Sequence, residues 1–321
     1  MRITKREHFG IQRKMVSHIT TESWRKIPHV TYMYEPDVTA FLEEYKKLNE
    51  GREKNEKITI NTLMLKTICE GLKAAPIMNS HLDFNRDFVT GKIDTFDNIN
   101  ISMPTILPNG EMMTINLRDF GTRSLEDMTA YIDDVRRRAK KTNLTEAMYS
   151  VSYDNTIKGL KSGHILRTIM KLAGANIGHC KIDHLRGKAK KEYDAIPETE
   201  RLTIKDLEQG IVTISNIGST YRNQHGAIGL LDIVPPQVTA FGIGAVQSKP
   251  IVVNVNGKEE VAIRKILPIC IAFDHRALDF GDTIPFLERL DEIFENPSII
   301  HSWVNFNRYA DGSDEPKLKE A

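Results

Sequence analysis

The sequence predicts one α/β domain, residues 1–310, in which a mixed β-sheet is flanked by helices. Strand-like segments rich in β-branched residues occur early in the chain and again after residue 210. Segments with helical periodicity lie between and after them. Internal repeats, low-complexity stretches and Ser/Gly linkers do not interrupt this pattern, so the sequence does not indicate a division into several domains. Residues 311–321 are expected to form a flexible tail.

The first part of the chain alternates helix and strand. Residues 11–28 are amphipathic and predict a helix that ends near Pro28. Residues 29–38 alternate like a strand, and residues 38–51 have helical periodicity with a glycine stop at the end. Residues 58–76 predict a helix with one buried side, which ends before a proline.

The middle of the chain predicts β-structure over 79–120, followed by a surface helix. The dipeptide Asn109-Gly110 stands between two strand-like runs and is a strong signal for a tight hairpin turn. Residues 124–141 begin with Ser-x-x-Asp, a helix-capping pattern, and carry a charged face. Residues 144–200 have a weaker pattern, in which 163–174 is a candidate helix lying over the core.

The last part of the chain returns to strands and closes with a helix. A second hairpin turn is predicted at Asn256-Gly257. The final helix covers 283–297, and its apolar stripe consists of Ile284, Leu287, Leu290 and Phe294. The predicted strand segments are 210–218, 234–246, 250–255 and 259–273.

The charge balance and the cysteines narrow the class of protein. The 321 residues include 44 Lys+Arg and 43 Asp+Glu, which argues against a nucleic-acid partner because phosphate binding needs a surplus of basic charge. The amino terminus lacks the apolar core of a signal peptide, and the apolar runs are too short to span a bilayer. Cys69, Cys180 and Cys270 are far apart and imply no disulfide framework. We therefore expect a cytoplasmic protein without a membrane partner.

The stretch IAFDHRALDFGD, residues 271–282, places His275 after an apolar run, with Asp279 four residues later. Three interpretations stay open: a histidine that only packs, a metal ligand, or a general base. A neutral imidazole accepts a proton from a thiol or hydroxyl once its tautomer is fixed. No metal is expected, because the further candidate ligands lack the spacing typical of zinc sites. These candidates are His164, His179, Cys180 and His184.

A base alone does not suffice for acyl transfer, because the tetrahedral oxyanion needs a hydrogen-bond donor. Ser215, at the end of an apolar strand beside Asn216 and Gly218, is a candidate donor. The alternative is a serine that only ends the strand. The context of Ser215 is not the Gly-x-Ser-x-Gly of a hydrolase nucleophile, and the chain has no glycine-rich nucleotide-binding motif.

Longer segments resemble a known family. Residues 10–143 and 201–298 are similar, in the same order, to the catalytic domain of dihydrolipoamide acyltransferases, the core components of 2-oxo acid dehydrogenase complexes. The resemblance rests on IQRKMVSHITTESWRKIPHVTYMY, KITINTLMLKTICEGLKAAP, NISMPTILPNGEMMTINL, GIVTISNIGS and ILPICIAFDHRALDFGD. It implies the chloramphenicol acetyltransferase-like fold, a mixed sheet flanked by helices, assembled as a homotrimer with active sites between subunits.

The resemblance also implies roles for individual residues. The histidine of the family's Asp-His-Arg-x-x-Asp-Gly motif is the general base, which corresponds to His275, and the following aspartate is its orienting partner, here Asp279. The serine of Thr-Ile-Ser-Asn donates to the oxyanion, which corresponds to Ser215. Arg13 is a candidate for an ion pair with Asp279. Coenzyme A and dihydrolipoamide enter a channel from opposite ends, and no acyl-enzyme forms.

The sequence departs from the family pattern in three respects. Phe280 stands where the family has glycine, with Gly281 one place later, and because phenylalanine tolerates positive φ poorly we expect a different loop and a changed channel. With Asn216, these residues are the predicted channel and loop positions. Residues 144–200 are predicted to be an insertion. We expect no lipoyl domain on this chain, so the lipoyl group belongs to a separate protein.

The favoured hypothesis is an acyltransferase that moves an acyl group, acetyl in the first instance, between coenzyme A and a thiol or hydroxyl acceptor. Two alternatives remain at this point. The altered Phe280-Gly281 loop and the expected lack of a lipoyl arm favour a non-catalytic trimeric scaffold that keeps the fold. The shared fold and motif also allow an antibiotic O-acetyltransferase. The joint presence of His275, Ser215 and Asp279 favours the enzyme over the scaffold.

Overall fold

A six-stranded sheet forms the centre of the protein, with strand order β1-β10-β7-β6-β4-β5. The computed structural model describes residues 2–106, 112–161 and 184–304. Strand β6 is parallel to β4 and β7, and the remaining neighbours are antiparallel, so the predicted mixed sheet is confirmed. The strands of this sheet are β1 (His29–Tyr34), β4 (Ile101–Ile106), β5 (Met112–Leu117), β6 (Val212–Asn216), β7 (Thr239–Ile243) and β10 (Ile269–Asp274).

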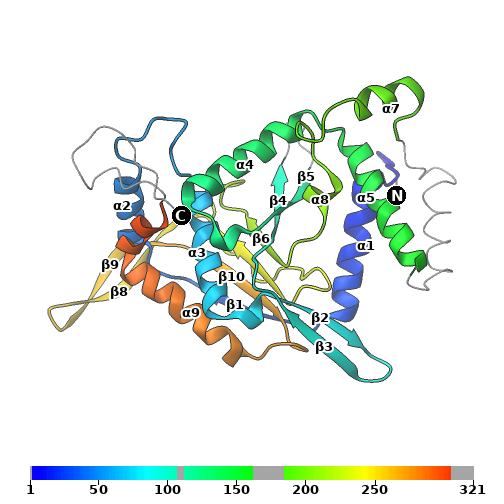
Figure 1. Cartoon of the computed structure of the whole chain (residues 1–321). Coiled ribbons are helices and arrows are strands. Elements are labelled where there is room, and N and C mark those ends of the chain that lie inside the picture. Colours follow the sequence, from blue (N-terminus) through cyan, green and yellow to red (C-terminus); the bar gives the residue numbers. More distant parts are fainter. Residues whose placement is uncertain (1, 107–111, 162–183, 305–321) are drawn as a thin grey trace.

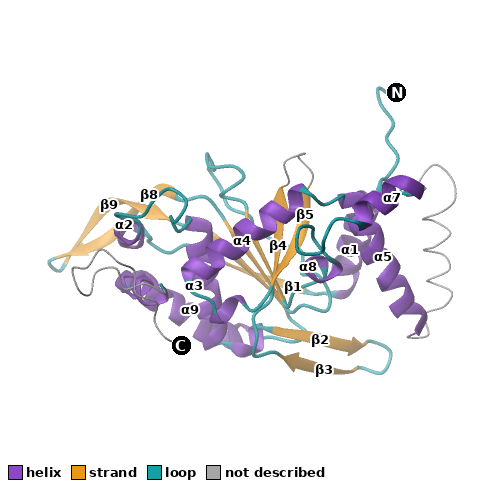
Figure 2. Ribbon diagram, turned by 45° about the horizontal axis from the view of Figure 1, so that its top comes forward, coloured by secondary structure: helices purple, strands orange, loops and turns teal. Residues whose placement is uncertain are grey.

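Helices lie on both sides of this sheet (Figures 1 and 2). Helices α3, α4 and α9 cover the face that carries the main core, whereas α1 lies beside α5 at the other side of the molecule (Figure 1). The described helices are α1 (Ile11–Lys26), α2 (Thr39–Leu48), α3 (Ile60–Ala74), α4 (Leu125–Lys140), α5 (Leu144–Lys161), α7 (Gly187–Asp194), α8 (Ile204–Leu207) and α9 (Phe280–Glu295). None of the helices in the described ranges is long and apolar enough to cross a membrane.

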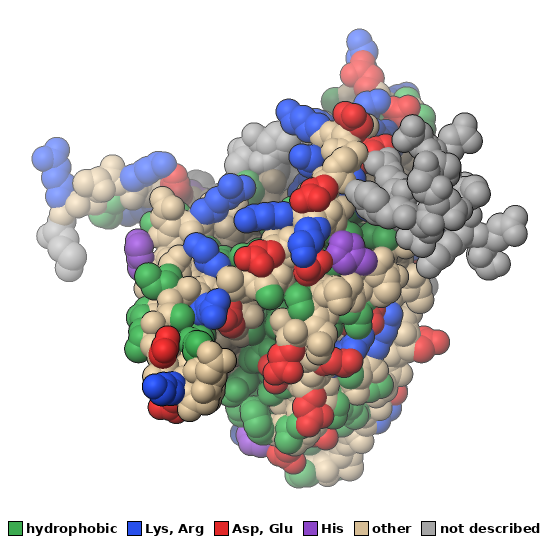
Figure 3. Space-filling view, turned by 90° about the vertical axis from the view of Figure 1, so that its left-hand side faces the viewer, with side chains coloured by type: hydrophobic (Ala, Val, Ile, Leu, Met, Phe, Trp, Pro, Cys, Tyr) green, Lys and Arg blue, Asp and Glu red, His purple; other side chains and the backbone are tan. Residues whose placement is uncertain are grey.

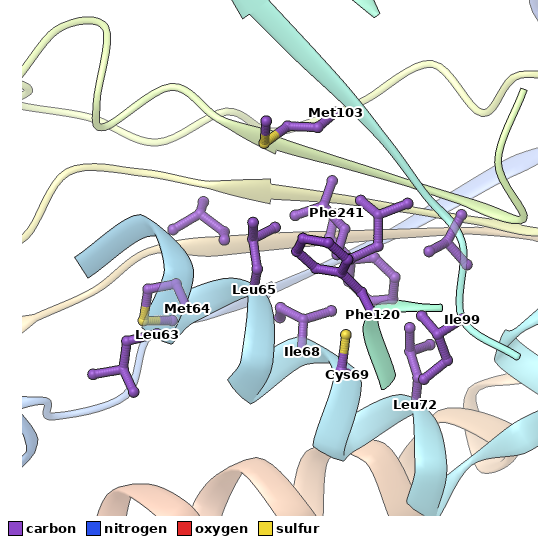
Figure 4. Packing of buried hydrophobic residues seen from close by; sticks show 14 of the residues in the cluster. Leu63, Met64, Leu65, Ile68, Cys69, Leu72, Ile99, Met103, Phe120 and Phe241 are labelled. Carbon is purple, nitrogen blue, oxygen red and sulfur yellow. The ribbon is translucent and has the colours of Figure 1, made fainter. Parts of the chain in front are cut away.

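The core lies between α3, α9 and the sheet. Figure 4 shows Leu65 and Ile68 of α3 directed towards Phe241 of β7. The ring of Phe241 stacks on that of Phe286 from α9, with 5.2 Å between ring centroids. Gly71 lets α3 and α9 approach closely, because a Cβ there would lie 2.6 Å from the side chains of Leu290 and Phe286. This packing holds the middle of α9 against α3 and β7.

Two hairpins extend from the main body. Strands β2 (Ser80–Asn85) and β3 (Thr90–Thr95) form one, and β8 (Gln247–Val255) and β9 (Lys258–Ile266) form the other. The predicted turn at Asn256-Gly257 is confirmed, since both residues have positive φ, 53° and 83°. Strands β4 and β5 are antiparallel as expected, while the predicted turn at Asn109-Gly110 lies outside the described residues.

The predicted helices and strands are largely confirmed, with two differences near the carboxyl end. The run 259–273 forms two strands, β9 and β10, separated by Leu267-Pro268. Helix α9 begins at Phe280, and its buried side consists of Thr283, Phe286, Leu290, Ile293 and Phe294. Ile284 is 42% exposed, so the predicted stripe was wrong at this position. The candidate helix 163–174 lies outside the described residues.

The molecular surface mixes the two signs of charge. Figure 3 shows Lys and Arg side chains interspersed with Asp and Glu across one face of the molecule. On α4, Arg136 pairs with Asp133 and Arg137 with Asp134, one helical turn apart. The basic run of this helix is therefore balanced locally by acidic neighbours.

Candidate active site

His275 directly follows the end of β10, an inner strand between β1 and β7. Its backbone N–H donates to the carbonyl of Pro28 (3.1 Å), which ties the residue to the chain entering β1. Its Nδ1 lies 3.1 Å from the carbonyl oxygen of Leu278 and 3.4 Å from Oδ1 of Asp279. In the neutral ring the contact with the carbonyl puts the proton on Nδ1, so Nε2 carries the free lone pair. Half of the side chain is exposed (50%), and no described residue hydrogen-bonds Nε2.

The residues on either side of His275 are joined to each other. Asp274 is fully buried, and its carboxylate accepts hydrogen bonds from the backbone N–H, Nε and Nη2 of Arg276, the last at 2.6 Å. The guanidinium of Arg276 lies 5.4 Å from the ring centroid of Phe84 in β2. The carbonyl of Asp274 accepts the N–H groups of Ala277 and Leu278. The turn that carries the imidazole is therefore fixed on both sides.

Sequence reasoning assigned no role to Asp274 or Arg276. The available signal was the opposite charge of the two residues that flank His275 in Asp-His-Arg. Local spacing does not reveal that the aspartate is buried, and burial is what makes its pairing with an arginine necessary.

Asp279 and the residues after it form the start of α9. The backbone N–H of Asp279 donates to Oδ2 of Asp282 (2.8 Å), which starts the helix, and the Asp279 side chain is 85% exposed. Phe280 is the first residue of α9, and its ring meets that of Tyr32 edge to face at 5.2 Å. Positive φ in the described non-glycine residues is confined to Val89, Asp119 and Asn256.

Neither Phe280 nor Gly281 therefore needs the backbone freedom of glycine. A Cβ built on Gly281 meets no atom within 4 Å. Phe280 starts a helix, where a side chain is tolerated, and the expected change of loop and channel relative to the family stays a prediction.

The expected ion pair between Arg13 and Asp279 is absent from the described part of the single chain. Arg13 lies near the start of α1, and it is the far end of this helix, Lys26, that approaches His275 through Pro28. The intervening helix is about 20 Å long at 1.5 Å per residue. The described ion pair of Asp279 is with His275 instead.

Ser215 lies on β6 and is partly buried. Among the described residues its hydroxyl has no hydrogen-bond partner. The next residue, Asn216, anchors this end of the strand: its Nδ2 donates to Oδ1 of Asn61 in α3 (2.8 Å), and its Oδ1 accepts the N–H of Ser219 (3.0 Å). The hydroxyl of Ser215 is thus free to bind a ligand on a strand end that is held in place.

Within one chain, the structure does not bring Ser215 and His275 together. Ser215 pairs with Gly242 of β7, and Gly242 pairs with Cys270 near the start of β10, whereas His275 follows the other end of β10. The two positions are five residues apart along the strand direction and two strands apart across the sheet. Because these directions are perpendicular, the separation is on the order of 19 Å. A site that uses both side chains requires two copies of the chain.

No group of three or more potential metal ligands occurs among the described residues. Of the further candidate ligands His164, His179, Cys180 and His184, only His184 lies within the described ranges. The ring of His184 stacks on that of Tyr149, with 4.5 Å between centroids.

Comparison with known sequences gives a consistent result. The family described as 2-oxoacid dehydrogenases acyltransferase (catalytic domain) matches residues 2–152 and 186–301. The acetyltransferase component of the pyruvate dehydrogenase complex of Buchnera aphidicola is 25% identical over 297 residues, 91% of this chain and 57% of that protein. The corresponding Haemophilus influenzae protein is 23% identical over 84% of this chain and 36% of its own length. The chain thus spans about half the length of these relatives.

Solved structures share the fold. A probable dihydrolipoamide acetyltransferase from Listeria monocytogenes aligns over 92% of this chain and 95% of its own, with a TM-score of 0.59 and 20% identity. The dihydrolipoamide acetyltransferase of Azotobacter vinelandii aligns over 94% of both chains, with a TM-score of 0.61 and 18% identity. With the family match across most of its length, this chain belongs to the 2-oxoacid dehydrogenase acyltransferase family, in the part that forms the catalytic domain.

Proposed function

We propose that the chain transfers an acetyl group between coenzyme A and a thiol or hydroxyl acceptor, by direct attack in a ternary complex. The observation that carries this proposal is the geometry of His275, a half-exposed imidazole whose Nδ1 is engaged by a backbone carbonyl, which makes Nε2 the basic atom. The relatives, which are dihydrolipoyllysine-residue acetyltransferase components, support acetyl as the acyl group and dihydrolipoamide as the acceptor.

In the proposed reaction, Nε2 of His275 takes the proton of the acceptor thiol while the sulfur attacks the thioester carbonyl carbon of acetyl-coenzyme A. The hydroxyl of Ser215 donates a hydrogen bond to the oxyanion of the tetrahedral intermediate. When the intermediate collapses, the bond between the carbon and the coenzyme A sulfur breaks. The imidazolium then returns its proton to the departing thiolate, so protons and electron pairs balance without a redox partner.

The distance between His275 and Ser215 within one chain supports an assembly in which each site takes His275 from one subunit and Ser215 from another. We propose a homotrimer, working in the cytoplasm with a lipoyl protein as partner. The role of a serine, a histidine and an asparagine four residues after that histidine has been investigated for the catalytic mechanism of the Azotobacter vinelandii enzyme. Here Asp279 stands four residues after His275 and is proposed to orient its ring.

The test is the acyl-transfer rate of His275→Ala and Ser215→Ala, measured with acetyl-coenzyme A and dihydrolipoamide. We expect His275→Ala to lose about 10²–10⁴-fold in kcat, the value of a positioned base. Ser215→Ala should lose about 10²–10³-fold, the value of an oxyanion donor. The control is His301→Ala, which removes an exposed histidine paired with Glu44 and should leave the rate unchanged. Parent-like turnover by folded His275→Ala would reject the proposal.

A further inference from the structure

The face of the sheet around Ser215 is lined by small side chains. Ser215, Gly242 and Cys270 stand opposite one another on β6, β7 and β10, and paired residues project from the same face. Their chain neighbours Ile214, Phe241 and Ile271 project into the main core on the other face. The surface of the sheet beside Ser215 is therefore recessed, because Gly242 has no side chain.

Leu231 occupies the space above Gly242. A Cβ built on Gly242 would lie 2.8 Å from Cδ1 and 3.3 Å from Cδ2 of Leu231, so the leucine methyl groups take the place of a side chain there. Ser215 is the strand partner of Gly242, and adjacent strands are about 4.8 Å apart. The methyl groups of Leu231 thus stand as an apolar wall over the strand position next to Ser215.

The segment that carries Leu231 is held firmly. Ile233 is fully buried in a small cluster with Ile27, Ala240 and Ala272, against which Leu231 packs. The backbone N–H of Ile233 donates to Nε2 of His29 (3.1 Å). Because the segment is tied to both β1 and the sheet, Leu231 cannot swing away without unpacking this cluster.

We propose that Leu231 is a specificity-determining residue that limits the acyl group to short, uncharged chains such as acetyl. The inference rests on the proposed function, in which Ser215 binds the carbonyl oxygen of the thioester. The acyl carbons next to that carbonyl then lie against Leu231, and a longer chain collides with it. An apolar wall also offers no partner for a carboxylate, so succinyl is excluded from the same pocket.

The experiment compares kcat/KM for acetyl-, propionyl- and butyryl-coenzyme A in the parent and in Leu231→Ala, with dihydrolipoamide as acceptor. We expect the butyryl-to-acetyl ratio to rise about tenfold or more in Leu231→Ala, the usual effect of one or two methylene groups in an apolar pocket. The matched control is Leu230→Ala, which removes the same atoms from the adjacent, 37% exposed residue and should leave the ratio unchanged.

Leu231→Val, a smaller change, provides a second variant and is expected to give an intermediate ratio. Thermal unfolding confirms that each variant is folded. An unchanged ratio in folded Leu231→Ala and Leu231→Val, or the same rise in Leu230→Ala, overturns the assignment of Leu231 alone. Absence of acetyl transfer in the parent overturns the proposed function and this inference together, so the two failures are distinguishable.

Discussion

Cys69 and Cys270 are buried thiols, and their surroundings remove them from the chemistry of this protein. Burial raises the pKa of the Cys69 thiol to about 12 and that of Cys270 to about 11. Both therefore remain protonated at neutral pH, whereas a cysteine nucleophile must be a thiolate. Although Cys270 is on the same row of the sheet as Ser215, its state is consistent with direct transfer between two substrates rather than through a thioester on the protein.

The burial and the raised pKa of both thiols predict how the cysteines react with an alkylating reagent. In native protein at pH 8, neither Cys69 nor Cys270 should be alkylated by iodoacetamide over an hour, because each is buried and protonated. Both should be alkylated within minutes in denaturant. Mass spectrometry of the digested protein measures each site separately, and rapid labelling of Cys270 in the folded protein would contradict the prediction.

At the same scale, the sequence identified His275, Ser215 and Asp279 through short motifs and a family resemblance, and their roles stay proposals. It did not reveal the pairing of Asp274 with Arg276, since burial depends on the strands that surround β10. It also suggested an Arg13–Asp279 ion pair that the single chain does not contain. Contacts between distant residues require the path of the backbone, which a local pattern does not contain.

At the scale of elements, the junction of α4 and α8 depends on one ion pair. Arg138 of α4 makes two hydrogen bonds to the carboxylate of Asp206 in α8, at 2.8 and 3.0 Å, and Asp206 also accepts from Thr203. Burial alone would raise the pKa of Asp206, but the hydrogen bonds from Arg138 and Thr203 outweigh it and lower that pKa. The charged form of the carboxylate therefore stabilises the fold.

Arg138→Met is expected to lower the free energy of unfolding by about 3 kcal/mol, because it leaves a buried carboxylate unpaired. Since the pKa of Asp206 is lower in the folded state, its contribution is complete above the unfolded value of about 3.9 and is lost as the pH falls through the folded value. The difference in free energy of unfolding between the parent and Arg138→Met should therefore become smaller below about pH 4.

Urea unfolding at pH 7 and at pH 3.5 measures this effect. The control is Arg136→Met, whose partner Asp133 is exposed and which should change stability by less than about 0.5 kcal/mol. An equal loss of unfolding free energy in the two variants would show that the buried ion pair of Arg138 stabilises the protein no more than the exposed pair of Arg136.

Individual elements were predictable where a local signal decides them. Asn256-Gly257 was predictable because a tight hairpin needs positive φ at both positions. The buried side of α9 was harder to predict. The observed and the predicted sides share Leu290 and Phe294 and differ by a rotation about the helix axis. The packing of α9 against α3 at Gly71 and against Phe241 of β7 decides which side is buried, and Ile284 is left exposed.

At the scale of the whole molecule, the order of strands in the sheet separates His275 from Ser215. The sequence could not supply that order, because β6, β7 and β10 pair across long stretches of chain. The family resemblance predicted a mixed sheet, which is confirmed, and a site between subunits, which stays a prediction.

A mixing experiment tests the shared site. His275→Ala and Ser215→Ala chains are each expected to be nearly inactive. In the proposed trimer, reassembly from an equal mixture should restore activity at roughly a quarter of the sites, where an intact histidine faces an intact serine across a heterologous interface. The transfer rate before and after reassembly measures this. No recovery in mixed trimers, verified by two different affinity tags, would place both residues within one subunit's site or outside any site.

The ion pair of Asp274 with Arg276 bears on the conformational freedom of His275. A free histidine samples many backbone and side-chain states, and that conformational entropy must be lost before it can act as a base. Here the Asp274–Arg276 pair and the Pro28 carbonyl fix the backbone when the chain folds, and the Leu278 carbonyl restricts the ring through Nδ1. In its proposed role as the base, His275 is therefore positioned before any substrate arrives, and little of the binding energy of the proposed acyl donor has to be used to align it.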